Sequence, residues 1–191
     1  MDEIKEILEK TGALLSGHFI LSSGLHSPNY VQCAKVFEFP AYGELVGKHL
    51  AEKILALNLK PTVVIGPALG GIIVAYEVGR FLGCRAMFTE REDGEMKLRR
   101  GFGLSENDSV IIVEDVVTTG KSTKEVEDVV KSYGANIVAY ASVINRSGTE
   151  NPFEKPYVYL IKLEFPTYEP DNCPLCRDGI PAVKPGSRRM K

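Results

Sequence analysis

Apolar residues follow two patterns along the 191-residue chain. Short runs that are apolar throughout predict strands buried on both faces; they are residues 62–65, 84–88, 110–113 and 137–144. Stretches with apolar residues three or four positions apart predict helices; they are residues 41–57, 72–82 and 122–133. Because strands alternate with helices, we expect an α/β fold with a Rossmann-like parallel sheet and helices on both faces.

The two ends of the chain lack this alternation. Ile4, Ile7 and Leu8 have helical spacing, and Gly12 follows as a helix end. The next stretch, GHFILSSGLHSPNY, suits short strands or a hood over a site, and the proline-rich tail from Pro166 is expected to be irregular and partly mobile. We therefore expect a single domain, 1–191, made of an N-terminal hood region (1–40), an α/β core (41–165) and an irregular tail (166–191).

The segment TEREDGEMKLRRGFGLSEND follows the second apolar run and is charged and poor in core residues. It is typical of a long surface loop or hairpin. Gly94, Gly101 and Gly103 offer flexible points, and we expect residues 89–103 to have few core contacts and to be mobile.

Polar segments follow three of the predicted strands, at the sheet edge where parallel sheets bind ligands. They are GPALGG, EDVVTTGKS and NRSG. The second ends in Gly-Lys-Ser, as an ATPase phosphate loop does, but that loop needs a glycine five positions before Gly120. Asp115 stands there instead. The spacing therefore argues against an ATPase.

The same segment still has the chemistry of a phosphate site. Backbone N–H groups and hydroxyls at a helix N-terminus suit a phosphate monoester; the residues that offer them are Thr118, Thr119, Gly120, Lys121 and Ser122. Glu114 and Asp115 precede them, and two carboxylates accept hydrogen bonds from a vicinal diol or act as outer ligands of Mg²⁺. Phosphate and diol together indicate a ribose 5-phosphate; the alternative is a strand that merely ends in a polar turn.

Composition narrows the classes of partner. The chain is 44% hydrophobic and 25% charged with a net charge of −2 and no extended basic run, so we expect no nucleic acid partner. No apolar stretch reaches the length of a membrane span, and the acidic start is unlike a signal peptide. We expect a cytoplasmic protein without a membrane partner.

Two of the four cysteines, Cys173 and Cys176, form a Cys-Pro-Leu-Cys pair near the tail. The pair is half of a metal site, a redox pair, or two reduced cysteines without a chemical role, and we prefer the last interpretation. No histidine is close in sequence, so a complete zinc site would need a second chain or the distant cysteines Cys33 and Cys84.

The pattern of four apolar residues, an acidic pair, two apolar residues and Thr-Thr-Gly-Lys-Ser resembles the fingerprint of the type I phosphoribosyltransferases. The resemblance implies that the acids bind the ribose hydroxyls of 5-phosphoribosyl 1-diphosphate (PRPP) and that the following loop grips its 5′-phosphate. It assigns PRPP binding to Glu114, Asp115, Val116, Val117, Thr118, Thr119, Gly120, Lys121 and Ser122, and diphosphate binding to Ala68, Leu69, Gly70 and Gly71. Mg²⁺ is the implied cofactor, carried by PRPP near Glu114 and Asp115, with no metal ligand assigned directly to the protein.

GHFILSSGLHSPNY, VINRSG and CPLCRDGIPAVKPGSR extend the resemblance to the orotate phosphoribosyltransferases over most of the chain. The implied reaction moves the ribose 5-phosphate group of PRPP to N1 of orotate, giving orotidine 5′-phosphate and diphosphate in pyrimidine biosynthesis. Arg146 offers a planar fork for the orotate carboxylate, and the resemblance puts Thr118 near the same base. A surface ion pair is the alternative for Arg146. Transfer to another base, or a PRPP-sensing regulator of the same fold, are the alternatives for the function.

The predicted loop departs from the pattern of many relatives, because it contains no histidine. Its available cations are Arg91, Lys97, Arg99 and Arg100, and we take Arg91, Lys97 and Arg99, with Glu114 and Asp115, as the catalytic candidates. Ser22 and Ser23 stand where some relatives have a lysine. The resemblance also implies a homodimer in which this loop acts on the neighbouring subunit.

Overall fold

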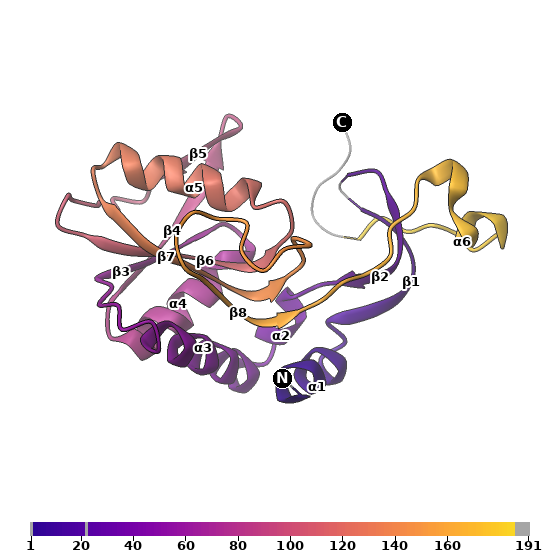
Figure 1. The fold of residues 1–191 in the computed structure, drawn as a ribbon, viewed down its shortest axis with the longest axis horizontal. Helices are drawn as coiled ribbons and strands as arrows, with labels where there is room; N and C mark the ends of the chain where they lie inside the picture. Colours follow the sequence, from indigo (N-terminus) through magenta and orange to yellow (C-terminus); the bar gives the residue numbers. More distant parts are fainter. Residues whose placement is uncertain (1, 22, 186–191) are drawn as a thin grey trace.

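A six-stranded sheet forms the centre of the protein, which we describe from a computed structural model covering residues 2–21 and 23–185 (Figure 1). The strand order is β5-β4-β3-β6-β7-β8, and every neighbouring pair is parallel except β4 and β5. The strands are β3 (Val63–Pro67), β4 (Arg85–Glu92), β5 (Glu95–Leu98), β6 (Ser109–Val117), β7 (Asn136–Asn145) and β8 (Tyr157–Lys162). The predicted parallel sheet is confirmed.

Helices cover both faces of this sheet, as the sequence predicts. One face carries α1 (Asp2–Lys10), α2 (Ala34–Phe37), α3 (Pro40–Leu55) and α4 (Gly70–Leu82), and the other carries α5 (Lys121–Ser132) (Figure 1). Each face has its own apolar cluster: Leu50 and Val74 pack with Ile111 on the first, and Val126 packs with Ile112 on the second. Neighbouring residues of β6 thus point into different clusters, as alternation along a strand requires. Among the described helices none is long and apolar enough to cross a bilayer.

The strands are longer than the apolar runs that predict them. The run 110–113 is part of β6, which continues to Val117, so Glu114, Asp115, Val116 and Val117 lie within the strand and not in the loop after it. Pairing with β7 continues to Val117 and Asn145 and overrides the polarity of the acids. β8 follows β7 in parallel without an intervening helix. It lies outside the expected strand–helix alternation, which is why that pattern does not predict it.

The sequence allows the charged segment from Thr89 to be a loop or a hairpin, and the structure shows a hairpin made of the end of β4 and β5. β4 and β5 pair from Thr89 with Leu98 to Glu92 with Glu95. The expectation of few core contacts is wrong, because partly buried apolar side chains of this segment pack against the α5-side cluster; they are Met96, Leu98, Phe102 and Leu104. The sequence does not predict these contacts, because the apolar residues of the segment are too few to form the pattern of a helix or of a fully buried strand. An antiparallel hairpin needs to bury only one of its faces.

A small hairpin of β1 (Leu14–Ile20) and β2 (His26–Val31) stands beside the large sheet, where the sequence predicts a hood (Figure 1). The tail runs along it through bridges between Phe19 and Val183 and between His26 and Tyr168. The described part of the tail also contains a 3-10 helix η1 (Pro170–Asn172) and the short helix α6 (Pro174–Arg177). The tail is therefore irregular but anchored by backbone pairing. Ser22 and the tail residues 186–191 lie outside the described residues.

Candidate active site

The turn between β6 and α5 has the form of an anion site. Gly120 caps α5 with φ 71°, a left-handed conformation that glycine adopts without strain. The Lys121 N–H donates to Thr119 Oγ1 at 3.3 Å, and the first N–H groups of a helix lack intrahelical partners. Thr118 and Thr119 are exposed. The turn therefore presents hydroxyls and amides at the positive end of a helix dipole.

The acid pair lies on the strand that leads into this turn. Since side chains alternate along a strand, Glu114 and Asp115 point to opposite faces of the sheet. Glu114 is buried and lies opposite Ser142 of β7, whereas Asp115 is half-buried and its Oδ1 accepts the Val116 N–H at 2.8 Å. Asp115 is thus the acid directed at the face that carries α4.

The glycine turn GPALGG meets this carboxylate. A Cβ on Gly70 would lie 2.4 Å from Asp115 Oδ2, so only glycine leaves room for the carboxylate at the N-terminus of α4. Gly66 and Gly71 are in similarly close contact, because a Cβ on Gly66 would lie 2.5 Å from the Gly71 carbonyl oxygen. The glycines therefore bring the end of β3, the start of α4 and the acid of β6 together.

One of the predicted diphosphate donors is engaged within the protein. The Ala68 N–H donates to the Thr89 carbonyl at 2.7 Å, which ties the glycine turn to β4. Leu69 is exposed, and Gly70 and Gly71 form the first turn of α4. Among the described residues, Thr89 Oγ1 is the buried side-chain oxygen without a hydrogen-bond partner, and it belongs to the residue whose carbonyl holds this turn.

Arg146 and Tyr30 extend the site toward the hood. The Arg146 N–H donates to the Val117 carbonyl at 2.8 Å, and its guanidinium carbon lies 4.9 Å from the centroid of the Phe165 ring. Burial lowers the pKa of Arg146. Burial raises the pKa of the Tyr30 hydroxyl, the Asp115 carboxylate raises it further, and Arg146 opposes them. Tyr30 therefore lies within electrostatic reach of both predicted site residues.

Tyr30 is a site residue that the sequence does not single out. It ends the stretch GHFILSSGLHSPNY, and an aromatic residue at the end of a predicted hood is the only signal for it. Arg146 takes part in no ion pair within the described part of the chain, so the alternative of a surface ion pair does not account for it.

The hairpin cations pair with carboxylates other than Glu114 and Asp115. Arg91 pairs with Glu125 of α5, Lys97 and Arg99 each pair with Glu92, and Arg100 pairs with Glu90. Lys97 Nζ is 3.2 Å from its carboxylate partner and the nearer Arg99 nitrogen is 2.8 Å from its own. These side chains are neutralised by the hairpin and by α5, and would have to exchange partners to reach a diphosphate.

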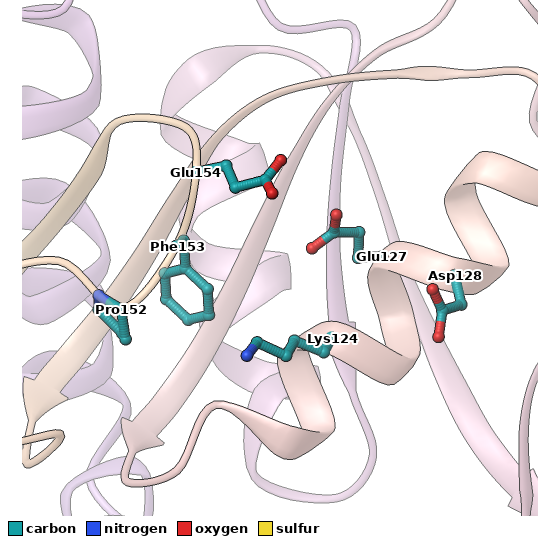
Figure 2. Close-up of a pocket in the computed structure, with 6 residues that line it drawn as sticks. All are labelled: Lys124, Glu127, Asp128, Pro152, Phe153 and Glu154. Carbon is teal, nitrogen blue, oxygen red and sulfur yellow. The ribbon is translucent and has the colours of Figure 1, made fainter.

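A surface cavity of about 310 Å³ lies between α5 and the loop after β7 (Figure 2). In Figure 2 the Lys124 side chain extends toward Pro152 and Phe153, and three carboxylates line the same hollow: Glu127, Asp128 and Glu154. None of the predicted site residues lines it. Three carboxylates against one ammonium do not suit a phosphate ligand, so this cavity is not the candidate site.

The donor set at the acid pair fits Mg²⁺ only in company with a phosphate ligand. Within the described residues, three or more metal-ligating side chains gather in a single place, at His18, His26, Cys173 and Cys176, on the hood side of the molecule. Glu114 and Asp115 offer hard carboxylate oxygens but are not part of such a group. Mg²⁺ is usually held by one or two carboxylates together with substrate phosphates, which is the set that this edge can offer.

A phosphate-binding turn, a carboxylate at the end of a parallel strand and a glycine turn together define an α/β protein that binds a sugar phosphate or nucleotide. The family model for a phosphoribosyl transferase domain matches residues 35–170. Orotate phosphoribosyltransferase from Thermotoga maritima is 56% identical over 188 residues, which are 98% of this chain and 100% of that protein. Orotate phosphoribosyltransferase from Caldanaerobacter subterraneus subsp. tengcongensis is 50% identical over 189 residues, covering 99% and 98% of the two chains.

Solved structures share the fold at much lower identity. Orotate phosphoribosyltransferase from Aeropyrum pernix has a TM-score of 0.64 at 22% identity and covers 83% of this chain and 93% of that one. Adenine phosphoribosyltransferase from Trypanosoma brucei has a TM-score of 0.63 at 15% identity, covering 83% and 79%. The chain belongs to the phosphoribosyltransferase family and, within it, to the orotate phosphoribosyltransferases.

Proposed function

We propose that the protein transfers the ribose 5-phosphate group of PRPP to N1 of orotate, giving orotidine 5′-phosphate and diphosphate in pyrimidine biosynthesis. The observation that carries this proposal is the meeting of Asp115 with the N-terminus of α4 at Gly70, on the strand that leads directly into the N-terminus of α5. Two helix N-termini on either side of a carboxylate suit a substrate with a phosphate at each end and hydroxyls between.

The protein's own task is to position and to stabilise charge. The turn 118–122 holds the 5′-phosphate, and the amides of Leu69 to Gly71 face the departing diphosphate. As the bond at C1′ breaks, positive charge develops on the ribose ring, and the carboxylate of Asp115 stabilises it, whereas Glu114 points to the other face of the sheet. Mg²⁺ bound with PRPP supplies further positive charge to the diphosphate. Most of the catalysis comes from holding PRPP and orotate close together in the orientation that the reaction requires.

The orotate end of the site lies toward the hood. Arg146 is partly desolvated and stacked on Phe165, so its planar fork is fixed in one orientation for a carboxylate. Thr118 stands at the start of the phosphate turn, and Tyr30 of β2 lies within electrostatic reach of both Arg146 and Asp115.

A homodimer is part of the same proposal. Leu69, Ile73 and Tyr76 are exposed at the start of α4 with helical spacing, so they form one apolar stripe. A second copy on this stripe would lie beside the glycine turn, which is where the hairpin cations Lys97 and Arg99 of a neighbour are needed. We also infer a cytoplasmic enzyme, in keeping with a role in pyrimidine biosynthesis.

An absorbance assay tests the function. Purified protein mixed with PRPP, Mg²⁺ and orotate should consume orotate, and the reaction should stop when the divalent cation is chelated. A panel of uracil, adenine, guanine and hypoxanthine provides the specificity control. Turnover of one of those bases in place of orotate would move the protein to another branch of the family. PRPP binding without turnover of any base would identify a regulator instead.

A further inference from the structure

Two histidines and two cysteines converge from three separate parts of the chain. His18 comes from β1, His26 from β2, and Cys173 and Cys176 from the start of α6. Their ligand atoms all lie within 4.8 Å of one another. His18, His26 and Cys173 are buried, and Cys176 is exposed. The expectation that a complete zinc site would need a second chain or the distant cysteines is therefore wrong, because strand pairing with the tail brings two histidines to the cysteine pair.

The distances within this cluster suit four ligands of one ion. Cys173 Sγ is 3.6 Å from His18 Nε2, and Cys176 Sγ is 3.8 Å from His18 Nε2 and 3.3 Å from His26 Nδ1. A sulfur and a nitrogen that share a tetrahedral zinc ion are about 3.6 Å apart. The two nitrogens, His18 Nε2 and His26 Nδ1, are 2.7 Å apart. The rings would have to separate by roughly 0.6 Å to reach the spacing of a tetrahedral pair.

A hydrogen bond to the Ile180 carbonyl orients the His18 ring as a metal ligand. His18 Nδ1 lies 2.7 Å from the carbonyl oxygen of Ile180, which can only accept, so Nδ1 carries the proton. In a neutral imidazole, Nε2 then presents its lone pair to the cluster. Ile180 is held by its own N–H, which donates to the Leu175 carbonyl of α6. The turn that carries the cysteines thus also orients the histidine, as partners of metal-bound histidines commonly do.

We propose that His18, His26, Cys173 and Cys176 bind one structural Zn²⁺ ion. Two thiolates and two imidazoles in a closed set of four are the ligands that zinc prefers over the harder magnesium ion. The site joins the hood to the tail, because β1 and β2 carry the histidines and α6 carries the cysteines. Tyr30 lies on the same strand as His26 and within electrostatic reach of Asp115 and Arg146, so the ion stabilises a strand next to the active site while it takes no part in the reaction.

Metal analysis of untagged wild-type protein tests the proposal directly. We expect one zinc per chain, and we expect Co²⁺ in place of zinc to give thiolate charge-transfer bands and the visible spectrum of a tetrahedral ion. Removal of zinc by a chelator should lower the melting temperature by roughly 5 to 10 °C. Cys176→Ser should weaken zinc binding by more than about 100-fold, because loss of an outer partner alone costs 10- to 100-fold.

Cys84→Ser is the matched control, since Cys84 lies outside the cluster and should leave zinc binding unchanged. Cys176 is exposed, so its serine variant is expected to fold, and circular dichroism verifies this. Three results would each overturn the proposal: no stoichiometric zinc with no Co²⁺ charge-transfer band, equal zinc affinity in Cys176→Ser and wild type, or a Cys173–Cys176 disulfide in protein isolated from a reducing cytoplasm. None of these measurements depends on enzyme activity.

Discussion

Gly70 shows how the absence of one methyl group arranges the active site. An alanine there would bring Cβ to 2.4 Å from Asp115 Oδ2, and the carboxylate would have to move by about 1 Å to restore contact distance. A displacement of that size in a catalytic group costs on the order of 100-fold in rate. We therefore predict that Gly70→Ala lowers kcat/KM about 100-fold, and steady-state kinetics measures it.

Gly103→Ala is the control for this substitution, because a Cβ at Gly103 meets no atom within 4 Å. It should change neither activity nor melting temperature by much. If Gly70→Ala unfolded the protein in proportion to its loss of activity, the close contact would be a packing feature of α4 and not a device for placing Asp115.

Arg146 gives a second prediction at this scale. Arg146→Ala should raise the KM for orotate by roughly 10- to 150-fold, because a hydrogen bond to a charged group is worth about 1.5 to 3 kcal/mol. The dissociation constant for PRPP should change little. Arg146→Lys keeps the charge without the planar fork and should recover only part of the loss. Calorimetric titration that shows unchanged orotate affinity in the alanine variant would exclude the proposed contact.

At the scale of elements, the sequence predicts what depends on local pattern. The strands around Val64 and Ile111 and the helix α5 follow directly from apolar spacing, because these elements bury whole faces. The phosphate turn is also predicted from local sequence, because its glycine and hydroxyl residues are consecutive. The contact of Gly70 with Asp115, and of the histidines with the cysteines, depends on which strands are neighbours. No local pattern carries that information.

Asp108 joins several elements at the N-terminal ends of the parallel strands, opposite the candidate site. Its carboxylate accepts hydrogen bonds from Arg85 at 2.5 Å, from Thr62 at 2.9 Å and from the Ser105 N–H at 2.8 Å. Burial alone would raise the pKa of Asp108, but these donors outweigh it and lower the pKa to about 2. The carboxylate thus stabilises the folded state above its ordinary pKa, near pH 4, and this contribution is lost as the pH falls toward 2.

We predict that Asp108→Asn lowers the free energy of unfolding by about 1 to 2 kcal/mol at neutral pH, allowing for solvent screening around the exposed Arg85. The difference between variant and wild type should shrink as the pH falls from about 4, where the Asp108 carboxyl of the unfolded chain becomes protonated, to about 2, where that of the folded chain does. Urea denaturation at several pH values measures it, with the exposed Asp128→Asn as control. An equal deficit at low and neutral pH would show that the role of Asp108 does not depend on its charge.

At the scale of the whole molecule, the proposal is that the hairpin of one chain and the acid pair of another combine into one site. Within one chain, Lys97 and Arg99 are paired with carboxylates of their own hairpin, and Asp115 faces α4. The exposed stripe of Leu69, Ile73 and Tyr76 lies beside Gly70. A dimer formed through that stripe would set one subunit's hairpin near the other subunit's diphosphate site.

Mixing two inactive variants tests this arrangement. Arg99→Ala or Lys97→Ala chains lack a hairpin cation, and Asp115→Asn chains lack the ribose-side carboxylate. A heterodimer of the two contains one site with both groups intact, so random exchange should restore about one quarter of wild-type activity, whereas neither parent recovers any when incubated alone. Tyr76→Glu places a charge on the exposed stripe and should abolish the restoration by preventing dimer formation.

Subunit exchange must be verified independently, for example by mass spectrometry of the mixed dimers. If exchange occurs and no mixture regains activity, the hairpin acts within its own chain or its cations do not contact the diphosphate.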